Sequence, residues 1–321
     1  MTFLYRACRS PQNLLKYGAA ARIMAQWKTK LRLRGWMPMP APLRIVEAEQ
    51  ITRAVADLCE KANVYVGADI RAALSNARAL ETAPLARSVL DTLLANAEAA
   101  EREKLPLCQD TGMAVVFVSI GSDVHIAGDI NAAINEGVRR GYRAGYCRNS
   151  VVRDPIDRVN TGDNTPAVIY YDFMPGSSVR VTVAPKGFGS ENMSAVRMFS
   201  PSAGLSGVED FVVETVREAG PNPCPPVIVG VGLGGTMEKA ALLAKQALLR
   251  DVGSVHPDPF WAEAEARLLA RVNALGIGPA GFGGGTTALG VHILTYPTHI
   301  AGLPAAVNIG CHATRHRTAT I

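Results

Sequence analysis

Residues 222–250 read NPCPPVIVGVGLGGTMEKAALLAKQALLR, and this stretch carries two signals that point to different chemistries. The β-branched run at 226–231 predicts a buried strand, and the pattern over 235–250 predicts a helix. A GxGxxG fingerprint, typical of dinucleotide-binding turns, joins them at Gly230, Gly232 and Gly235. The stretch also begins with a cysteine, Cys224, so either its glycines or its thiol would carry the function.

The second half of a nucleotide-binding unit is missing. Such a unit needs a further strand that ends in an acidic residue about 20 residues past the turn, where it binds the ribose. Here Asp251 follows the helix directly, and VGSVHPDP after it is not a strand pattern. Pro225 and Pro226 also remove two backbone donors from the start of the predicted strand. The glycines are therefore left with two alternative roles, close helix packing or an anion cradle at a helix N-terminus.

The remaining pattern predicts helices first and mixed structure later. The first helix has apolar residues at helical spacing from Ile51 to Leu58, and the second begins at Asp69. Further helices are predicted at 84–103, 129–146, 207–219 and 258–274. Strands are predicted at 113–121, 167–174, 177–185, 286–295 and 303–309. We expect an α/β fold of mixed α+β character, with more than one mixed sheet surrounded by helices, in a single large domain over 45–321.

The net charge of +5 is unevenly distributed. Residues 1–46 hold nine of the 33 basic residues and none of the 28 acidic ones. The rest of the chain therefore holds 24 basic and 28 acidic residues. We interpret residues 1–44 as a basic extension that is disordered or precedes the native start at Met37 or Met39. A transit peptide and a polybasic arm are the alternatives. The mildly acidic remainder predicts no nucleic-acid partner.

Hydropathy and cysteine content predict a soluble, cytoplasmic protein. The chain has 321 residues, 48% of them hydrophobic, which is enough for a substantial core. No apolar run approaches the roughly 18 to 20 residues of a membrane span, so we expect no membrane association. The six cysteines form no CxxC pair and do not cluster, as expected in a reducing compartment.

Three of the cysteines share a distinctive context. Cys108, Cys224 and Cys311 each lie at the boundary of an apolar run beside Pro or Gly, where the backbone can turn a side chain into a cavity. The other three, Cys8, Cys59 and Cys147, lack this context, and we interpret them as inert. Widely spaced thiolates that converge on folding suit an iron–sulfur cluster or zinc, and spacing does not choose between these and three buried free thiols.

Six ordered motifs resemble one family. The chain from about 45 to 321 is similar to class I fumarate hydratases, which are iron–sulfur hydro-lyases, and specifically to their separate α subunit. The motifs are LCQDTGM, YCRNSVVRDP, APKGFGSENMSAVRMFSPSAG, NPCPPVIVGVGLGGTMEKAALLAKQALLR, GIGPAGFGGGTTALGVHI and PTHIAGLPAAVNIGCHATR.

The resemblance implies a cofactor and roles for individual residues. It implies a [4Fe–4S] cluster with one open iron, held by Cys108, Cys224 and Cys311. It implies proton-handling roles for Asp110 and His299, and substrate binding by Gln109, Arg148 and Gly189. Phe188 departs from the family, which commonly has glycine there, and we expect it to narrow the loop or the substrate pocket.

The resemblance also implies a reaction and a partner. The expected activity is reversible hydration of fumarate to (S)-malate, a tricarboxylic acid cycle reaction, with tartrate dehydration or mesaconate hydration as the alternatives. A separate β subunit would complete the active site around the small dicarboxylate, in an α2β2 assembly. A non-catalytic zinc- or nucleotide-binding protein is the alternative from a different class.

Overall fold

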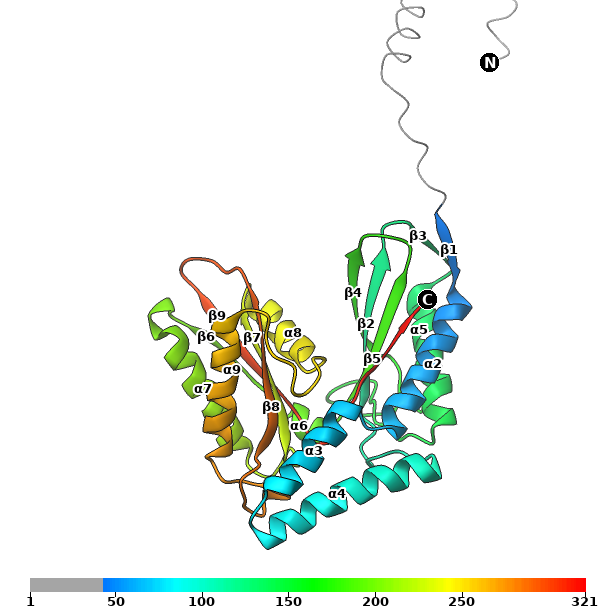
Figure 1. The fold of residues 1–321 in the computed structure, drawn as a ribbon. Helices are drawn as coiled ribbons and strands as arrows, with labels where there is room; N and C mark the ends of the chain where they lie inside the picture. Colours follow the sequence, from blue (N-terminus) through cyan, green and yellow to red (C-terminus); the bar gives the residue numbers. More distant parts are fainter. Residues whose placement is uncertain (1–42) are drawn as a thin grey trace, which may run out of the picture. The chain divides into compact units, whose positions relative to one another are not determined.

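The computed structural model describes residues 43–321, in which two four-stranded sheets lie among the helices (Figure 1). Residues Arg44–Ile321 form one compact unit. The predicted basic extension, together with Cys8, falls outside the described residues except at its last two positions. The expectation of a mixed α/β fold with more than one sheet is confirmed.

The first sheet has the strand order β10-β5-β2-β4. Its strands are β10 (Arg317–Thr320), β5 (Val179–Lys186), β2 (Met113–Gly121) and β4 (Val168–Met174). The β5 strand runs antiparallel to both of its neighbours, and β2 pairs parallel with β4. A separate parallel pair joins β1 (Arg44–Glu47) to β3 (Val124–Ala127).

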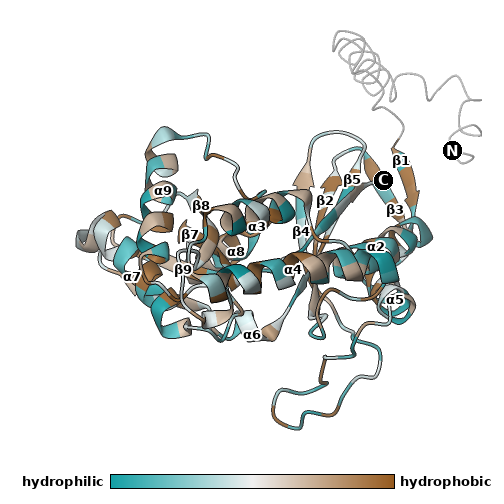
Figure 2. Ribbon diagram, turned by 60° about the horizontal axis from the view of Figure 1, so that its bottom comes forward, coloured by the Kyte–Doolittle hydropathy of each residue, from teal (hydrophilic) through white to brown (hydrophobic). Residues whose placement is uncertain are grey.

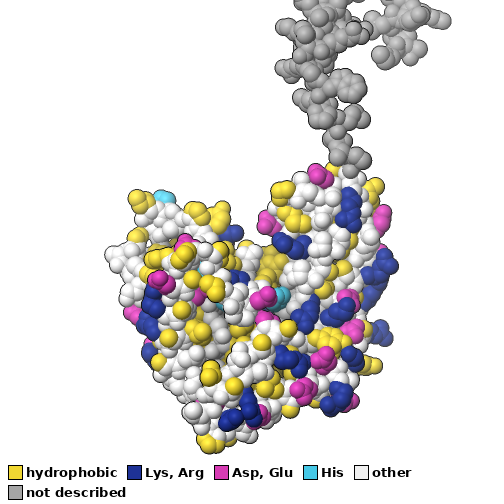
Figure 3. All heavy atoms as spheres, viewed as in Figure 1, with side chains coloured by type: hydrophobic (Ala, Val, Ile, Leu, Met, Phe, Trp, Pro, Cys, Tyr) yellow, Lys and Arg dark blue, Asp and Glu magenta, His cyan; other side chains and the backbone are white. Residues whose placement is uncertain are grey.

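One face of the first sheet is covered by α2 (Ala48–Val64) and α5 (Ile130–Ala144). Alternate strand residues such as Val116 and Val181 point into this core, as the period of two in a strand requires. The opposite face, including Phe117 and Thr182, lines a cavity of about 490 Å³ with α8 (Met237–Ala247). Figure 3 shows the surface hollowed between the two sheets.

The second sheet has the strand order β6-β9-β7-β8. Its strands are β6 (Ala195–Phe199), β9 (Leu303–Gly310), β7 (Val227–Gly234) and β8 (Ala288–Tyr296). The β9 strand runs antiparallel to β6 and β7, and β7 pairs parallel with β8. All eight residues of β7 are buried because helices cover both of its faces.

Alternate residues of β7 face different helices. Valines such as Val229 and Val231 pack with α7 (Gly204–Ala219) and α9 (Pro259–Asn273). On the other face Gly230 and Gly232 meet α8. A Cβ at Gly232 would lie 2.0 Å from the carbonyl oxygen of Ala240, so this backbone approach excludes any side chain.

Two further helices, α3 (Ala68–Leu80) and α4 (Pro84–Glu103), bury residues such as Leu74 and Leu90 against Ile228 at the start of β7. A single turn, α6 (Phe188–Glu191), follows β5. Figure 2 shows hydrophobic residues concentrated on the strands and hydrophilic residues on the outward sides of the helices. Within residues 43–321 no helix is long and apolar enough to cross a membrane.

The longer predicted elements are confirmed with small shifts at their ends. The predicted helix at 84–103 is α4, and the predicted strand at 113–121 is β2. The sequence analysis missed the short elements β1, β3, α6, β6 and β10. Elements of four or five residues are too short to show a hydrophobic period. The strands among them also pair with segments far away in the sequence.

The close contact between β7 and α8 predicts a large cost for any side chain at Gly232. We expect Gly232→Ala to lower the free energy of unfolding by about 3 kcal/mol, because Cβ would overlap backbone atoms of α8. Urea unfolding followed by circular dichroism measures the change. Gly302→Ala is the control, since its Cβ would meet no atom closer than 3.9 Å. Equal losses in the two variants would contradict the packing argument.

Candidate active site

The second sheet brings Cys224 and Cys311 to the same end. Cys224 precedes β7 and Cys311 follows β9, and these strands run antiparallel with Ile228 opposite Gly310. His312 ties the two segments together, since its Nδ1 lies 2.9 Å from the carbonyl oxygen of Cys224. A carbonyl oxygen only accepts, so Nδ1 carries the proton in this contact. His312 thus links the backbone of Cys224 to the segment that contains Cys311.

Cys224 has a left-handed backbone, with φ of +55°. Residues other than glycine rarely adopt this conformation, and where it occurs it is concentrated at functional sites. The backbone N–H of Cys224 donates to the carbonyl of Pro221 at 3.0 Å, which closes a tight turn before β7. The fold therefore holds this thiol in a defined place at some cost in backbone energy.

Cys108 is fixed from the other side by the loop between α4 and β2. The N–H of Leu107 donates to the carbonyl of Asn63 at 2.8 Å, at the end of α2. The buried guanidinium of Arg315 donates to the Asp110 carbonyl at 2.7 Å and to Asn63 Oδ1 at 3.2 Å. Arg315 thus links the segment after Cys311 to the segment after Cys108.

The three cysteines line one cavity of about 240 Å³. The predicted substrate-facing residues Gln109, Asp110 and Gly189 line it as well. Other lining residues are charged or lie in the connecting loops: Lys186, Ser190, Pro223, Lys245 and Arg315. Folding therefore gathers six of the eight predicted site residues from four separate segments.

Three thiols on one cavity are the donor type of an iron–sulfur cluster, whereas no three His, Cys, Asp or Glu side chains of residues 43–321 are grouped as they would be around a single metal ion. All three thiols are free, and burial raises the pKa of Cys311 and of Cys224. The neighbouring Cys311 and Cys108 thiols and the Asp110 carboxylate raise the pKa of Cys224 further. Thiols with raised pKa values stay protonated until a metal replaces the proton, and several thiols on one cavity are the usual ligands of such clusters.

The other described cysteines lie away from the cavity, in surroundings that agree with the expectation that they are inert. Cys59 is fully buried in the core of the first sheet, and Cys147 packs against that core. Burial raises the pKa of both thiols, that of Cys147 to about 11. Neither lines the cysteine cavity.

The Asp110 carboxylate is oriented by two backbone donors. The N–H of Gly112 lies 3.0 Å from Oδ1, and the N–H of Phe188 lies 2.9 Å from Oδ2. A carboxylate has further lone pairs, so Asp110 keeps acceptor capacity at the cavity wall. Phe188 contributes this backbone contact, but its half-exposed side chain is not part of the cavity lining.

Arg148 lies beside the cavity without lining it. Its backbone N–H donates to Thr111 Oγ1 at 2.9 Å, which ties it to the residue after Asp110. The Arg148 side chain is exposed and makes no hydrogen bond to the described residues.

His299 lies in the loop between β8 and β9, at the opposite end of the second sheet from Cys311. Eight residues of β9 separate the two ends, which corresponds to roughly 25 Å. The His299 ring accepts the N–H of Ala301 at 3.2 Å. This chain therefore does not bring His299 to Asp110.

A network of buried charges lies in the wall of the cavity. The Glu191 carboxylate contacts Lys186 Nζ at 3.1 Å and Lys245 Nζ at 2.6 Å. Asn308 donates to the same carboxylate at 3.0 Å. Burial by itself would raise the pKa of Glu191, but the two ammonium groups and the hydrogen bonds outweigh it and lower the value to about 2.

Two residues of this wall were missed by the sequence analysis. Lys245 belongs to an amphipathic helix pattern that reads as a solvated face, and Arg315 belongs to a quoted motif but carried no assigned role. The available signal for Arg315 was its position four residues after Cys311, a candidate ligand. Nothing in the local pattern distinguishes Lys245, because its partner Glu191 lies on α6, 54 residues earlier in the chain.

The family model described as fumarate hydratase (Fumerase) matches residues 52–320 of the chain. The chain belongs to this family of iron–sulfur hydro-lyases. It is 40% identical over 273 residues to the putative L(+)-tartrate dehydratase subunit alpha of Methanocaldococcus jannaschii, covering 83% of this chain and 95% of that protein. It is 33% identical over 273 residues to the L(+)-tartrate dehydratase subunit alpha of Escherichia coli strain K12, covering 84% and 90%.

The names of these relatives differ from the leading expectation of the sequence analysis. Both are named for L(+)-tartrate, which the sequence analysis placed second to fumarate. The family that matches is the one that the motifs resemble, and its members are iron–sulfur enzymes. The β7 glycines pack against α8, which agrees with the helix-packing alternative.

The low pKa of Glu191 predicts a pH-dependent contribution to stability. Because the folded-state value of about 2 lies below the ordinary 4.5, this contribution is complete above about pH 5 and is lost as the pH falls toward 2. We expect Glu191→Gln to lower the free energy of unfolding by about 2 to 3 kcal/mol at pH 7 and by much less near pH 2.

Urea unfolding across this pH range measures the difference. Glu214→Gln is the matched control, because Glu214 forms an exposed ion pair with Arg217 on α7, and we expect a change within about 0.5 kcal/mol. A difference between wild type and Glu191→Gln that does not depend on pH would contradict the assignment.

Proposed function

We propose that this chain is the α subunit of a two-subunit [4Fe–4S] hydro-lyase, with L(+)-tartrate as its leading substrate. The observation that carries the proposal is the convergence of Cys108, Cys224 and Cys311 on one cavity beside Gln109 and Asp110. The names of the relatives support tartrate. A cytoplasmic, reducing setting suits an oxygen-sensitive cluster of this kind.

Three thiolates leave one iron of a four-iron cluster without a protein ligand. When bound, such a cluster supplies a Lewis acid for the oxygens of the substrate through that open iron. The residues that would hold it are Cys108, Cys224 and Cys311.

The residues around the cysteines would bind the dicarboxylate and move one proton. Asp110, oriented by the N–H groups of Gly112 and Phe188, holds or delivers a proton at the substrate hydroxyl. The amide of Gln109 and the backbone N–H of Gly189 donate to substrate oxygens. Arg148 has a guanidinium group suited to binding a carboxylate, and its backbone N–H is hydrogen-bonded to Thr111, the residue after Asp110.

His299 requires a different arrangement. Its predicted role in proton transfer needs a carboxylate partner, and Asp110 of the same chain lies at the other end of the second sheet. We therefore assign His299 to a site completed by a neighbouring chain in an α2β2 assembly. The group that removes the proton from carbon, and further carboxylate contacts, would come from the β subunit.

Tartrate and malate undergo the same elimination. A proton leaves the carbon beside one carboxylate and hydroxide leaves the next carbon. Tartrate then gives an enol that becomes oxaloacetate, whereas malate gives fumarate. Fumarate hydration is the second candidate, because the family model that matches the chain is described as fumarate hydratase.

The test is anaerobic co-expression of this chain with its candidate β subunit. Iron, sulfide and turnover of L-tartrate and fumarate are measured on one sample. We expect several iron and sulfide equivalents per chain, release of oxaloacetate from tartrate, and loss of both cluster and turnover in Cys224→Ser. Cys147→Ser is the control, since this thiol lies outside the cavity, and it should keep both.

The outcomes separate the alternatives. Turnover of fumarate but not tartrate would support the second candidate. A protein without sulfide from a strictly anaerobic preparation would contradict the cofactor, and thermal stabilisation by zinc or NAD would then support the non-catalytic alternative.

A further inference from the structure

Lys245 projects from the last turn of α8 into the wall of the cysteine cavity. Its ammonium lies 2.6 Å from Glu191 Oε1, and the Lys245 side chain is only 16% exposed. Lys186 approaches the other oxygen of the same carboxylate at 3.1 Å, with its side chain 12% exposed. Two cations therefore share one anion at this wall.

The two ammonium groups differ in how many of their donors are used. Each has three N–H donors. Lys186 Nζ has three acceptors, namely Ser190 Oγ at 2.8 Å, Glu191 Oε2 at 3.1 Å and the Gly187 carbonyl at 3.5 Å. Lys245 Nζ has only Glu191 among residues 43–321. Two donors of Lys245 therefore remain for an occupant of the cavity.

Charge favours an anion as that occupant. Lys186, Lys245 and the buried Arg315 guanidinium line the cavity. The carboxylates of Glu191 and Asp110 offset two of these three charges, so one positive charge remains. A partly desolvated cation interacts more strongly with an anion than an exposed one does, because the surroundings screen less. Glu191 fixes the position of the ammonium, which reduces the entropy lost on binding.

We propose that Lys245 is a substrate-binding residue whose ammonium donates to a carboxylate of the dicarboxylate, with Glu191 as its positioning residue. The inference rests on the proposed function and adds a cationic contact to Gln109, Arg148 and Gly189. The proposal also gives a function to the network of Lys186, Glu191, Lys245 and Asn308, whose members come from β5, α6, α8 and β9.

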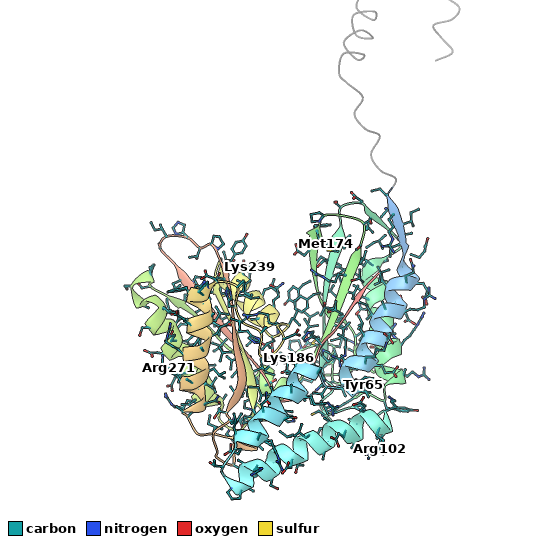
Figure 4. All side chains as sticks on the ribbon, in the orientation of Figure 1. Tyr65, Arg102, Met174, Lys186, Lys239 and Arg271 are labelled. Atoms are coloured by element: carbon teal, nitrogen blue, oxygen red, sulfur yellow. The ribbon has the colours of Figure 1, made fainter. Side chains whose placement is uncertain are left out.

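Lys239 provides a matched control on the same helix. Its ammonium lies 4.8 Å from the centre of the Tyr296 ring, and it does not line the cysteine cavity. In Figure 4 Lys186 lies low between the two sheets, whereas Lys239 lies near the upper end of the second sheet.

The experiment measures binding of succinate and L-tartrate to the complex of this chain with its β subunit, purified and reconstituted with iron and sulfide under anaerobic conditions. Succinate has neither a hydroxyl to lose nor a double bond to hydrate, so calorimetry reports its binding alone. We expect Lys245→Gln to raise the Kd for succinate by about 10- to 100-fold, as for loss of a charged hydrogen bond. Lys245→Arg should recover part of the affinity, and Lys239→Gln should stay within about twofold of wild type.

The absorption spectrum of the cluster and the electron paramagnetic resonance signal of its reduced form are recorded on the same samples. We expect both to match wild type in Lys245→Gln. A changed cluster signal with unchanged succinate binding would overturn the proposal, because Lys245 would then influence the cluster and not bind the dicarboxylate. Absence of succinate binding to the wild-type complex would overturn it as well.

Failure of the proposed function has a different signature. Succinate binding that depends on Lys245, in a complex that turns over neither tartrate nor fumarate, would support the binding residue and contradict the reaction. Circular dichroism checks that the variants fold. Lys245→Met keeps the length of the side chain without its charge and gives the same comparison if Lys245→Gln is unstable.

Discussion

The close packing of α8 on β7 is the constraint on which the site depends. Gly230 and Gly232 carry no side chain, so the backbone of α8 lies directly against that face of the strand. The helix then runs back along β7 toward its beginning, where Cys224 lies. Lys245, in the last turn of α8, therefore reaches the same cavity as Cys224. Any bulk at the glycines would move the helix that forms one wall of the site.

The cavity is assembled from loops whose positions are fixed by elements far apart in the sequence. Pairing of β7 with β9 sets Cys224 beside Cys311, and the buried Arg315 connects that end of the sheet to the loop of Cys108 and Asp110. The charges around the cysteines are paired or hydrogen-bonded, which buried charges require. Lys245 has Glu191 as its single partner among residues 43–321, so two of its donors are left over, and it is therefore the group best placed to meet an anion.

In the proposed function, this chain supplies only part of a dicarboxylate site. It provides thiols, an oriented carboxylate and cationic groups at one cavity, while His299 lies at the far end of the second sheet. This division is understandable if a second chain closes the cavity and supplies the missing base. Tartrate and malate lose water by the same two bond cleavages, so the shared residues do not distinguish them, and selectivity must come from contacts to the second hydroxyl of tartrate.

The sequence by itself determined the long helices and strands and the mixed α/β class, and the resemblance of its motifs to a known family predicted the six residues that share the cavity. These follow from periodicity over ten or more residues and from ordered motifs, which are local properties of the chain. Only the tertiary structure decided that Gly232 serves helix packing, that Lys245 and Arg315 belong to the site, and that His299 does not reach Asp110 within one chain. Each of these depends on which strands pair and in which direction, and such long-range pairing leaves no trace in the local pattern of residues.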